Sequence, residues 1–231
     1  MIAVIDYGAG NLRNVCKALE HVGARLTLTD DPRVLERADK LVLPGVGAFA
    51  DCQQGLKARG LFEPLRALAM SGKPLLGICV GLQLLFEVGE EMGEWEGLGL
   101  IPGRVVRFRF SQASHEHAQL KIPHIGWNQL WLKQPNHPLL AGVRDGDYAY
   151  FVHSYHPQIA DPAHVLAVTD YGYEFPSVVA RGNVWGIQFH PEKSQDVGLR
   201  MLRNFVTWPA EGATFEDSKA RVEHVHNLSG D

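Results

Sequence analysis

The sequence predicts an α/β fold: an open, mixed but mainly parallel sheet flanked by helices, with an antiparallel extension in the second half of the chain. Two patterns carry this prediction. Short apolar runs alternate with helix-like segments through residue 87, which is typical of βαβ units. After residue 100 the chain is richer in β-branched and aromatic runs, which favour strands. With 231 residues and 45% hydrophobic composition, the chain can bury a sizeable core.

The first half begins with an apolar run at residues 1–5 and a turn at residues 6–8. Apolar residues at helical spacing then predict a helix from Asn11 to about Val22, with Asn11 as its N-cap and Gly23 as its stop. Further strand-like runs lie at residues 25–29, 41–43 and 75–78, and further helix-like segments at residues 61–70 and 82–87.

The second half contains a series of short strand-like runs separated by turn residues. They lie at residues 105–110, 127–132, 148–152, 165–169, 177–180 and 184–189, and a last helix is expected at about 197–208. Residues 111–119 are polar and predict a loop. We therefore expect one domain over residues 1–208. The segment 209–231 holds five acidic and two basic residues, and we expect it to be a loosely attached tail.

Composition excludes several classes of function. The 22 basic and 26 acidic residues give a net charge of −4, unlike the basic footprint of nucleic-acid binders. The longest mostly apolar run, residues 74–86, is shorter than the ~20 residues that span a bilayer. Three cysteines do not form a disulfide scaffold and favour a reducing, cytoplasmic location. Of these, Cys16 lies on the apolar stripe of the first helix, and Cys52 has no partner motif.

The strongest local motif is Gly77-Ile78-Cys79-Val80-Gly81, which lies between an apolar strand and a helix. It matches the nucleophile elbow, with cysteine in place of serine. A tight strand-to-helix turn requires small flanking residues and places the thiol at a helix N-terminus, which favours the thiolate. The backbone N–H of Val80 could then bind an oxyanion. The alternative is that Cys79 is a small buried residue beside a tight turn.

A thiolate nucleophile needs a general base and an orienting group. His190 ends an apolar strand, and Glu192 follows two positions later. The carboxyl ends of parallel strands meet at one edge of a sheet, so His190 and Cys79 could lie together there. The alternative is a histidine packed at a strand end beside a solvated Glu192.

A second oxyanion donor could come from Pro44-Gly45-Val46-Gly47-Ala48-Phe49, which also follows an apolar strand. This glycine turn lacks the Gly-Lys-Ser/Thr of a phosphate loop. The histidines of residues 153–156 have no acidic or cysteine neighbour, so no zinc site is expected. We expect neither a metal nor a cofactor.

Three motifs together, PGVGAF (44–49), GICVGLQ (77–83) and GIQFHPEKS (186–194), resemble class I glutamine amidotransferases, the triad-type glutaminases. Within that family the chain is most similar to the branch that serves a cyclase in histidine biosynthesis. The segments DYGAGNLRNV (6–15), PHIGWNQL (123–130), YFVHSYH (150–156) and GLRMLRNFVTW (198–208) carry this closer likeness. The resemblance covers about residues 1–208 and implies a flavodoxin-like fold.

The resemblance also implies roles for individual residues. Cys79 would be the nucleophile, His190 the acid and base, and Glu192 the orienting carboxylate. The remaining implied residues are the oxyanion hole (Val46, Gly47 and Val80), the substrate contacts (Gln83 and the backbone of His153, Ser154 and Tyr155), and residues facing a partner (Asn11 and the loop of His124, Gly126, Trp127 and Asn128).

The implied reaction is hydrolysis of glutamine through a cysteine thioester. The ammonia would pass to a separate cyclase subunit with a (β/α)₈ barrel. Two alternatives stay open: a class I glutaminase that serves another synthase, and a non-catalytic, redox-sensing binding protein on the same fold.

Overall fold

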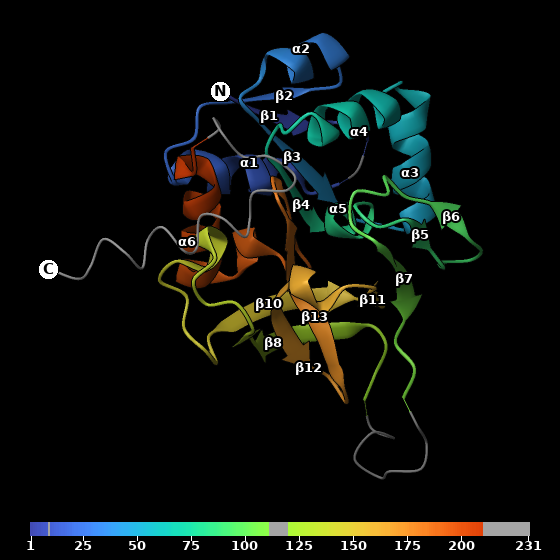
Figure 1. Cartoon of the computed structure of the whole chain (residues 1–231), viewed down its shortest axis with the longest axis vertical. Coiled ribbons are helices and arrows are strands. Elements are labelled where there is room, and N and C mark those ends of the chain that lie inside the picture. The colour runs from blue at the N-terminus through green and yellow to red at the C-terminus, as the bar shows by residue number, and fades with distance from the viewer. Residues whose placement is uncertain (9, 111–119, 210–231) are drawn as a thin grey trace, which may run out of the picture.

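The computed structural model describes residues 1–8, 10–110 and 120–209 of the chain. Within them, eight strands form one sheet in the order β2-β1-β3-β4-β14-β13-β12-β9 (Figure 1). The strands, in the order of the sheet, are β2 (Leu26–Thr29), β1 (Ile2–Ile5), β3 (Lys40–Gly45), β4 (Leu75–Cys79), β14 (Val184–Ile187), β13 (Glu174–Arg181), β12 (Val165–Asp170) and β9 (Trp131–Leu132). The expected loop at 111–119 and the expected tail beyond residue 209 lie outside the described residues.

The sheet is parallel in one half and antiparallel in the other. Strands β2, β1, β3, β4 and β14 run parallel, in the 2-1-3-4-5 order of flavodoxin-like folds. Strands β13, β12 and β9 continue the sheet as antiparallel neighbours. This arrangement confirms the predicted fold class.

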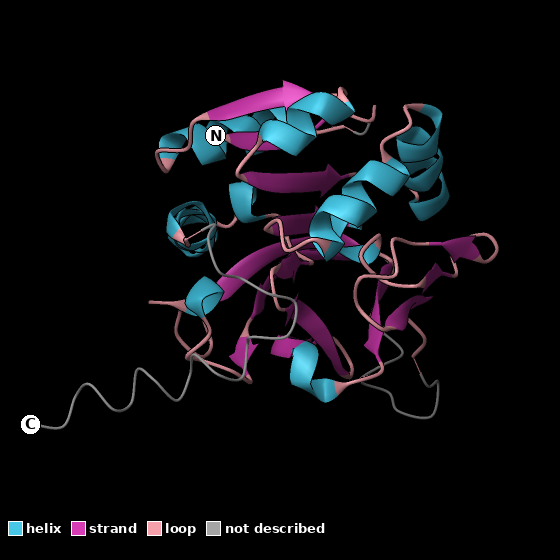
Figure 2. Ribbon diagram, turned by 45° about the horizontal axis from the view of Figure 1, so that its top comes forward, coloured by secondary structure: helices cyan, strands magenta, loops and turns pink. Residues whose placement is uncertain are grey.

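Helices cover both faces of the parallel half (Figure 2). Helix α1 packs beside α6 on one side, and α3 packs beside α4 on the other (Figure 1). The helices are α1 (Leu12–His21), α2 (Pro32–Arg37), α3 (Phe49–Ala58), α4 (Phe62–Met70), α5 (Val80–Gln83) and α6 (Gln195–Thr207), with short 3₁₀ turns η2 (Pro138–Leu140), η3 (Pro162–His164) and η4 (Pro191–Lys193). In these described segments, no helix combines the length and apolar character needed to cross a bilayer.

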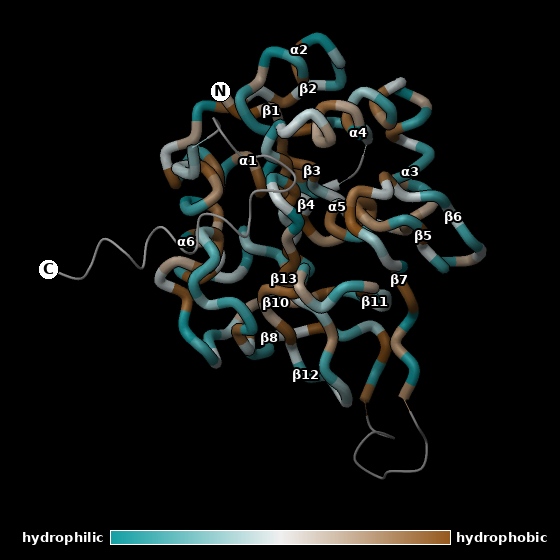
Figure 3. Tube along the Cα trace, viewed as in Figure 1, coloured by the Kyte–Doolittle hydropathy of each residue, from teal (hydrophilic) through white to brown (hydrophobic). Residues whose placement is uncertain are grey.

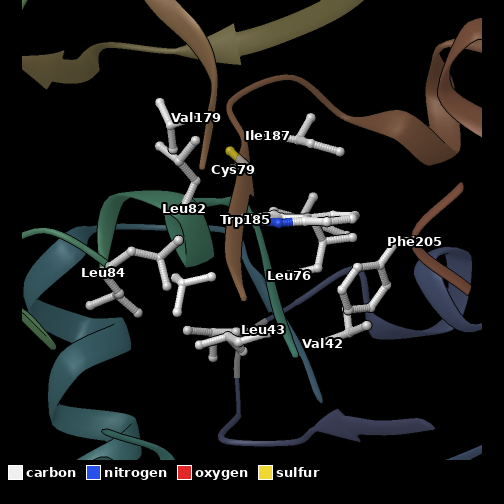
Figure 4. Close-up of a cluster of buried hydrophobic side chains, with 14 of the residues drawn as sticks. Val42, Leu43, Leu76, Cys79, Leu82, Leu84, Val179, Trp185, Ile187 and Phe205 are labelled. Carbon is white, nitrogen blue, oxygen red and sulfur yellow. The ribbon is translucent and has the colours of Figure 1, made fainter. Parts of the chain in front are cut away.

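The core lies along the central strands. Every residue of β1, β3, β4 and β14 is buried. Hydrophobic residues accordingly concentrate along these strands, and hydrophilic ones on outlying helices such as α2 (Figure 3). Trp185 is the largest fully buried side chain, and its ring packs against those of Phe205 and Trp208. Figure 4 shows this part of the core, to which Cys79 also belongs.

Two smaller sheets lie beyond the main one. Strand β8 (His124–Gln129) pairs with β10 (Tyr148–His153) in one. The other holds β11 (Tyr155–Ile159), β7 (Gly103–Arg107), β5 (Val88–Gly89) and β6 (Trp95–Glu96). Because β10 leads directly into β11, the chain passes from one small sheet to the other at residues 153–155.

Three local predictions differ from the structure. The helix expected at 82–87 is the four-residue α5, because the chain turns after Gln83 to reach β5. The expected loop at His124–Asn128 is strand β8. Asn11 is not a side-chain cap: its φ of 68° lies in the left-handed region, and its side chain makes no capping hydrogen bond. Helices α2 and α3 had no counterpart in the sequence prediction.

Candidate active site

Cys79 occupies a strained turn at the end of β4. Its backbone has φ 55° and ψ −112°, a conformation that non-glycine residues rarely adopt, and α5 begins at the next residue. The flanking glycines permit the turn by close backbone approach. A Cβ atom on Gly81 would lie 1.8 Å from the Leu43 carbonyl oxygen, and one on Gly77 would lie 2.5 Å from the Gly81 oxygen. The strained, glycine-flanked elbow that the sequence predicted is therefore present.

His190 reaches the same sheet edge from β14. Strands β4 and β14 are parallel neighbours, with Ile78 opposite Ile187, so both chains leave the sheet together. On one side His190 faces Cys79, whose side chain acts to raise the pKa of the imidazole. On the other side its Nδ1 lies 2.8 Å from Glu192 Oε1, which places a hydrogen on Nδ1. The structure thus brings Cys79, His190 and Glu192 together in a buried chain.

The electrostatics of this group favour an ion pair. Burial disfavours the charged imidazolium, but the hydrogen bonds and charges of Cys79 and Glu192 outweigh burial and raise the pKa of His190 to about 10. Burial likewise disfavours the Glu192 carboxylate, but His190 and Asn11 hold its pKa below the usual value. A protonated His190 and an ionised Glu192 therefore form a buried ion pair.

Asn11 is a site residue that the sequence analysis missed in this role. Its Nδ2 donates to Glu192 Oε1 at 2.5 Å, across 181 residues of sequence. Asn11 is the residue immediately before α1, and its backbone is left-handed. Asn11 is half-buried, and its side chain contacts Glu192; that it also faces a partner stays a prediction. Its place after the first apolar run was the signal that could have found it.

The glycine turn after β3 lies against the elbow. Gly45 pairs with Cys79 in the sheet, and a Cβ on Gly45 would lie 2.6 Å from the Gly81 nitrogen. Val46 and Gly47 follow at this edge, with Gly47 at φ 117°, and Val80 is the first residue of α5. The residues expected to form an oxyanion hole therefore come from two adjacent strand ends.

Two side chains from elsewhere support this turn. The Tyr7 hydroxyl donates to the Pro44 carbonyl at 2.6 Å. Cys52, in α3, is buried, and its Sγ lies 3.9 Å from the Val46 carbonyl oxygen. Burial raises the pKa of the Cys52 thiol to about 11, which keeps it a neutral donor. Cys52 thus helps to hold the turn. Cys16 is only partly buried against the core.

Strand β10 and the segment after it form the opposite wall. The Val152 carbonyl oxygen lies 4.0 Å from Cys79 Sγ. Gln83, the expected substrate contact, is buried, and its Nε2 donates to the Tyr155 carbonyl at 3.0 Å and to Gln188 Oε1 at 3.3 Å. The Gln83 side chain therefore braces the 153–155 backbone, where the sequence analysis placed the amino-acid end of the substrate. The Ser154 carbonyl accepts from the Phe108 N–H.

The residues expected to face a partner divide into two groups. His124 is 3% exposed, so its side chain points inward, contrary to expectation. Its neighbours Ile125 and Trp127 are 60% and 46% exposed, and Gly126 and Asn128 are half-buried. Alternation along β8 explains the split, because successive side chains of a strand point to opposite faces. Nowhere in the described ranges do three or more His, Cys, Asp or Glu residues cluster as a metal site.

Comparison with known proteins identifies the family of the chain. The family model for "Glutamine amidotransferase class-I" matches residues 3–208. The chain belongs to this family. Among curated class I relatives, one from Syntrophotalea carbinolica is 53% identical over 205 residues, covering 89% of this chain and 98% of the relative. One from Salinibacter ruber is 51% identical, covering 90% and 95%. Both are named imidazole glycerol phosphate synthase subunit HisH, and the chain belongs with these HisH subunits.

Solved structures share the fold of this chain at lower identity. A glutamine amidotransferase crystal structure superposes with a TM-score of 0.68 at 22% identity, covering 89% of this chain and 97% of that one. The structure of PurLQS from Thermotoga maritima gives a TM-score of 0.67 at 20% identity, covering 89% and 96%. At such identities the likeness concerns the fold alone.

Proposed function

We propose that this chain is the glutaminase subunit of an imidazole glycerol phosphate synthase. The observation that carries the proposal is the buried Cys79–His190–Glu192 chain on a strained elbow. The HisH relatives, which match the chain over about nine-tenths of its length, support the choice of synthase. The substrate would be glutamine, and the products glutamate and ammonia.

In the first half-reaction the Cys79 thiolate attacks the side-chain amide carbon of glutamine. A C–S bond forms, and the amide C–N bond breaks as the His190 imidazolium gives its proton to the departing nitrogen. The raised pKa of His190 keeps that proton available at neutral pH. The products of this step are ammonia and a γ-glutamyl thioester on Cys79.

In the second half-reaction His190, now neutral, takes a proton from water as the water attacks the thioester. The C–S bond breaks, glutamate leaves, and the thiolate and imidazolium are restored. In both steps negative charge develops on the former amide oxygen, where the N–H groups of Val80 and the 46–47 turn would stabilise it. One such donor contributes about 10²–10³ in rate.

A partner surface is available next to this site. The exposed side chains of Ile125, Trp127 and Tyr148 lie on paired strands β8 and β10. Large apolar side chains gathered on one face indicate a protein contact. We propose that a (β/α)₈ cyclase subunit binds here and receives the ammonia. That subunit would form imidazole glycerol phosphate and an aminoimidazole carboxamide ribotide.

The test is synthesis by the complex with the cyclase subunit, with either glutamine or ammonium salt as nitrogen source. Cys79→Ala is expected to lower glutamine-dependent synthesis by at least about 10³-fold, because it removes the nucleophile. Ammonia-dependent synthesis should be retained, because the cyclase performs that step. Cys16→Ala, on α1, is the matched control and should retain both activities.

The same experiment separates the alternatives. A chain that does not bind this cyclase but releases glutamate with another synthase would be a glutaminase of a different branch. A Cys79→Ala complex that still uses glutamine would contradict the assignment of the nucleophile. If the wild-type complex releases no glutamate but the thiol oxidises reversibly, the redox-sensing alternative holds.

A further inference from the structure

A chain of side-chain hydrogen bonds runs from the surface strand β8 to the wall of the candidate active site. Asn128 Nδ2 lies 3.3 Å from His124 Nε2, and His124 Nδ1 lies 3.1 Å from His153 Nε2. His153 Nδ1 in turn lies 2.8 Å from the Tyr155 carbonyl oxygen, the same oxygen that accepts from Gln83. We refer to Asn128, His124, His153 and the Tyr155 carbonyl as the histidine relay.

The direction of every hydrogen bond in the relay is determined by its ends. A carbonyl oxygen only accepts, so His153 must donate to Tyr155 from Nδ1–H, which leaves its Nε2 as an acceptor. His124 must therefore donate to His153 from its own Nδ1–H, and its Nε2 accepts from Asn128.

The Asn128 end agrees with this direction independently. The Asn128 Oδ1 accepts from the backbone N–H of Gln129, so its amide nitrogen faces the Asp170 carbonyl and His124. Each donor in the relay thus meets an acceptor, with both imidazoles neutral and both carrying their hydrogen on Nδ1.

The surroundings keep both rings neutral and immobile. His124 stacks between the rings of Tyr171 and Phe151, at centroid distances of 4.0 and 4.9 Å. Burial lowers the pKa of His124 to about 4 and that of His153 well below the usual value. Neutral rings in fixed orientation do not carry protons from one end to the other. They couple the position of β8 to that of the 153–155 backbone, because displacement of β8 would break a buried hydrogen bond.

One end of the relay lies on the surface strand β8, and the other lies at the wall of the candidate active site. At one end, β8 carries Ile125 and Trp127 on the surface that we propose for the cyclase. At the other end, the Tyr155 carbonyl and Gln83 brace the 153–155 backbone beside Cys79 and His190. Figure 1 shows β8 and β10 side by side, with β10 leading toward β11.

We propose that His124 and His153 are positioning residues that hold the substrate-binding 153–155 backbone in register with the partner-binding strand β8. This inference rests on the proposed function. It predicts that breaking the relay weakens the binding of glutamine in the complex, while assembly of the complex and cyclase chemistry persist.

The first test uses the wild-type chain. ¹⁵N spectra of histidine-labelled protein in the complex should show His124 and His153 as neutral Nδ1–H tautomers at pH 7. An Nε2–H tautomer or an imidazolium at either position would overturn the relay, since its hydrogen bonds could not then form.

The second test compares His124→Phe with His156→Phe in the complex. Phenylalanine keeps the ring packing but removes the relay bonds. His156 is a matched control: it is buried in the same aromatic cluster, but it bonds to the Pro157 carbonyl and Tyr173 hydroxyl. We expect His124→Phe to raise KM for glutamine about 5- to 10-fold, as for one lost buried hydrogen bond. Its kcat and its ammonia-dependent rate should stay within about twofold, and His156→Phe should change KM less than about twofold.

The outcomes separate the two proposals. An active wild-type complex in which both variants share the same KM for glutamine would overturn the relay alone. A wild-type complex that releases no glutamate would overturn the proposed function and the relay with it.

Discussion

At the scale of single residues, the site depends on how His190 is held. Its Nδ1 hydrogen is bound by Glu192, and Glu192 is bound by Asn11 from the other end of the chain. This arrangement fixes the ring orientation and leaves Nε2 for the thiol and the leaving group. Glu192 Oε2 is buried, with no hydrogen-bond partner among the described residues. The carboxylate charge is therefore directed mainly at the imidazolium.

The pH dependence of the complex tests this pairing. Removing the Glu192 charge in Glu192→Gln destabilises the imidazolium, so the pKa of His190 falls from its raised value. Glutamine-dependent kcat/KM, which needs protonated His190, should then decline at least about one pH unit earlier on the alkaline side, equivalent to about 1.4 kcal/mol. The exposed Glu174→Gln is the control. An alkaline limb at the same pH in both variants would contradict the role of Glu192.

At the scale of elements, one buried lysine terminates helix α6. Lys40 Nζ donates to the carbonyls of Phe205 and Val206, each at 2.7 Å, and to that of Trp208. These carbonyls lie at the helix C-terminus, where no intrahelical donor is available and the helix dipole favours a cation. Lys40 belongs to β3, so this contact attaches the last helix to the central sheet. Lys73 makes similar contacts with carbonyls at the end of α2.

Lys40→Met tests the energetic importance of this attachment. The methionine keeps most of the apolar stem but leaves buried carbonyls without their charged donor. We expect the free energy of unfolding to fall by about 2–3 kcal/mol, the usual loss when a charged hydrogen-bond donor is removed from buried acceptors. Lys17→Met, an exposed lysine on α1, should change it by less than about 0.5 kcal/mol. Equal unfolding free energies for the two variants, measured by urea denaturation, would refute the attachment.

At the scale of the whole molecule, buried neutral histidines make the fold sensitive to acid. Burial lowers the pKa of His124 and His137 to about 4, and lowers those of His153 and His156 as well. In the unfolded chain each titrates near 6.5. Their contribution to stability is therefore complete above pH 6.5 and is lost as the pH falls toward about 4. The stabilisation from His190, whose pKa is raised, is already present below about pH 6.5 and is lost only as the pH rises toward about 10.

The free energy of unfolding should thus decrease as the pH is lowered from 6.5 to 5, before most carboxylates titrate. Each histidine adds a slope of at most about 1.4 kcal/mol per pH unit. His137→Asn should reduce the pH dependence of the unfolding free energy by about the contribution of one histidine. Asparagine still provides an acceptor for the Leu139 N–H but does not titrate. Urea denaturation at several pH values measures the free energy of unfolding of both proteins. A flat profile between pH 7 and 5 would show that the histidines are not neutral in the folded state.

The sequence by itself determined the fold class and the candidate triad. The period of apolar residues reports which segments are strands and helices, and parallel strands end at a common edge. Cys79 and His190 follow two apolar strands, so local patterns predicted that they lie at one edge of the sheet. The glycines beside Cys79 likewise indicated a turn too tight for side chains.

Only the tertiary structure decided the contacts that cross between elements. The bond from Asn11 to Glu192, the hydrogen-bond chain through His124 and His153, and the inward position of His124 depend on register and packing between distant segments. Local periodicity does not specify the register between distant segments. A shift of one residue in the pairing of a strand turns all of its side chains to the opposite face of the sheet. The short α5 was decided in the same way, since the chain turns after Gln83 to pair β5 with β7.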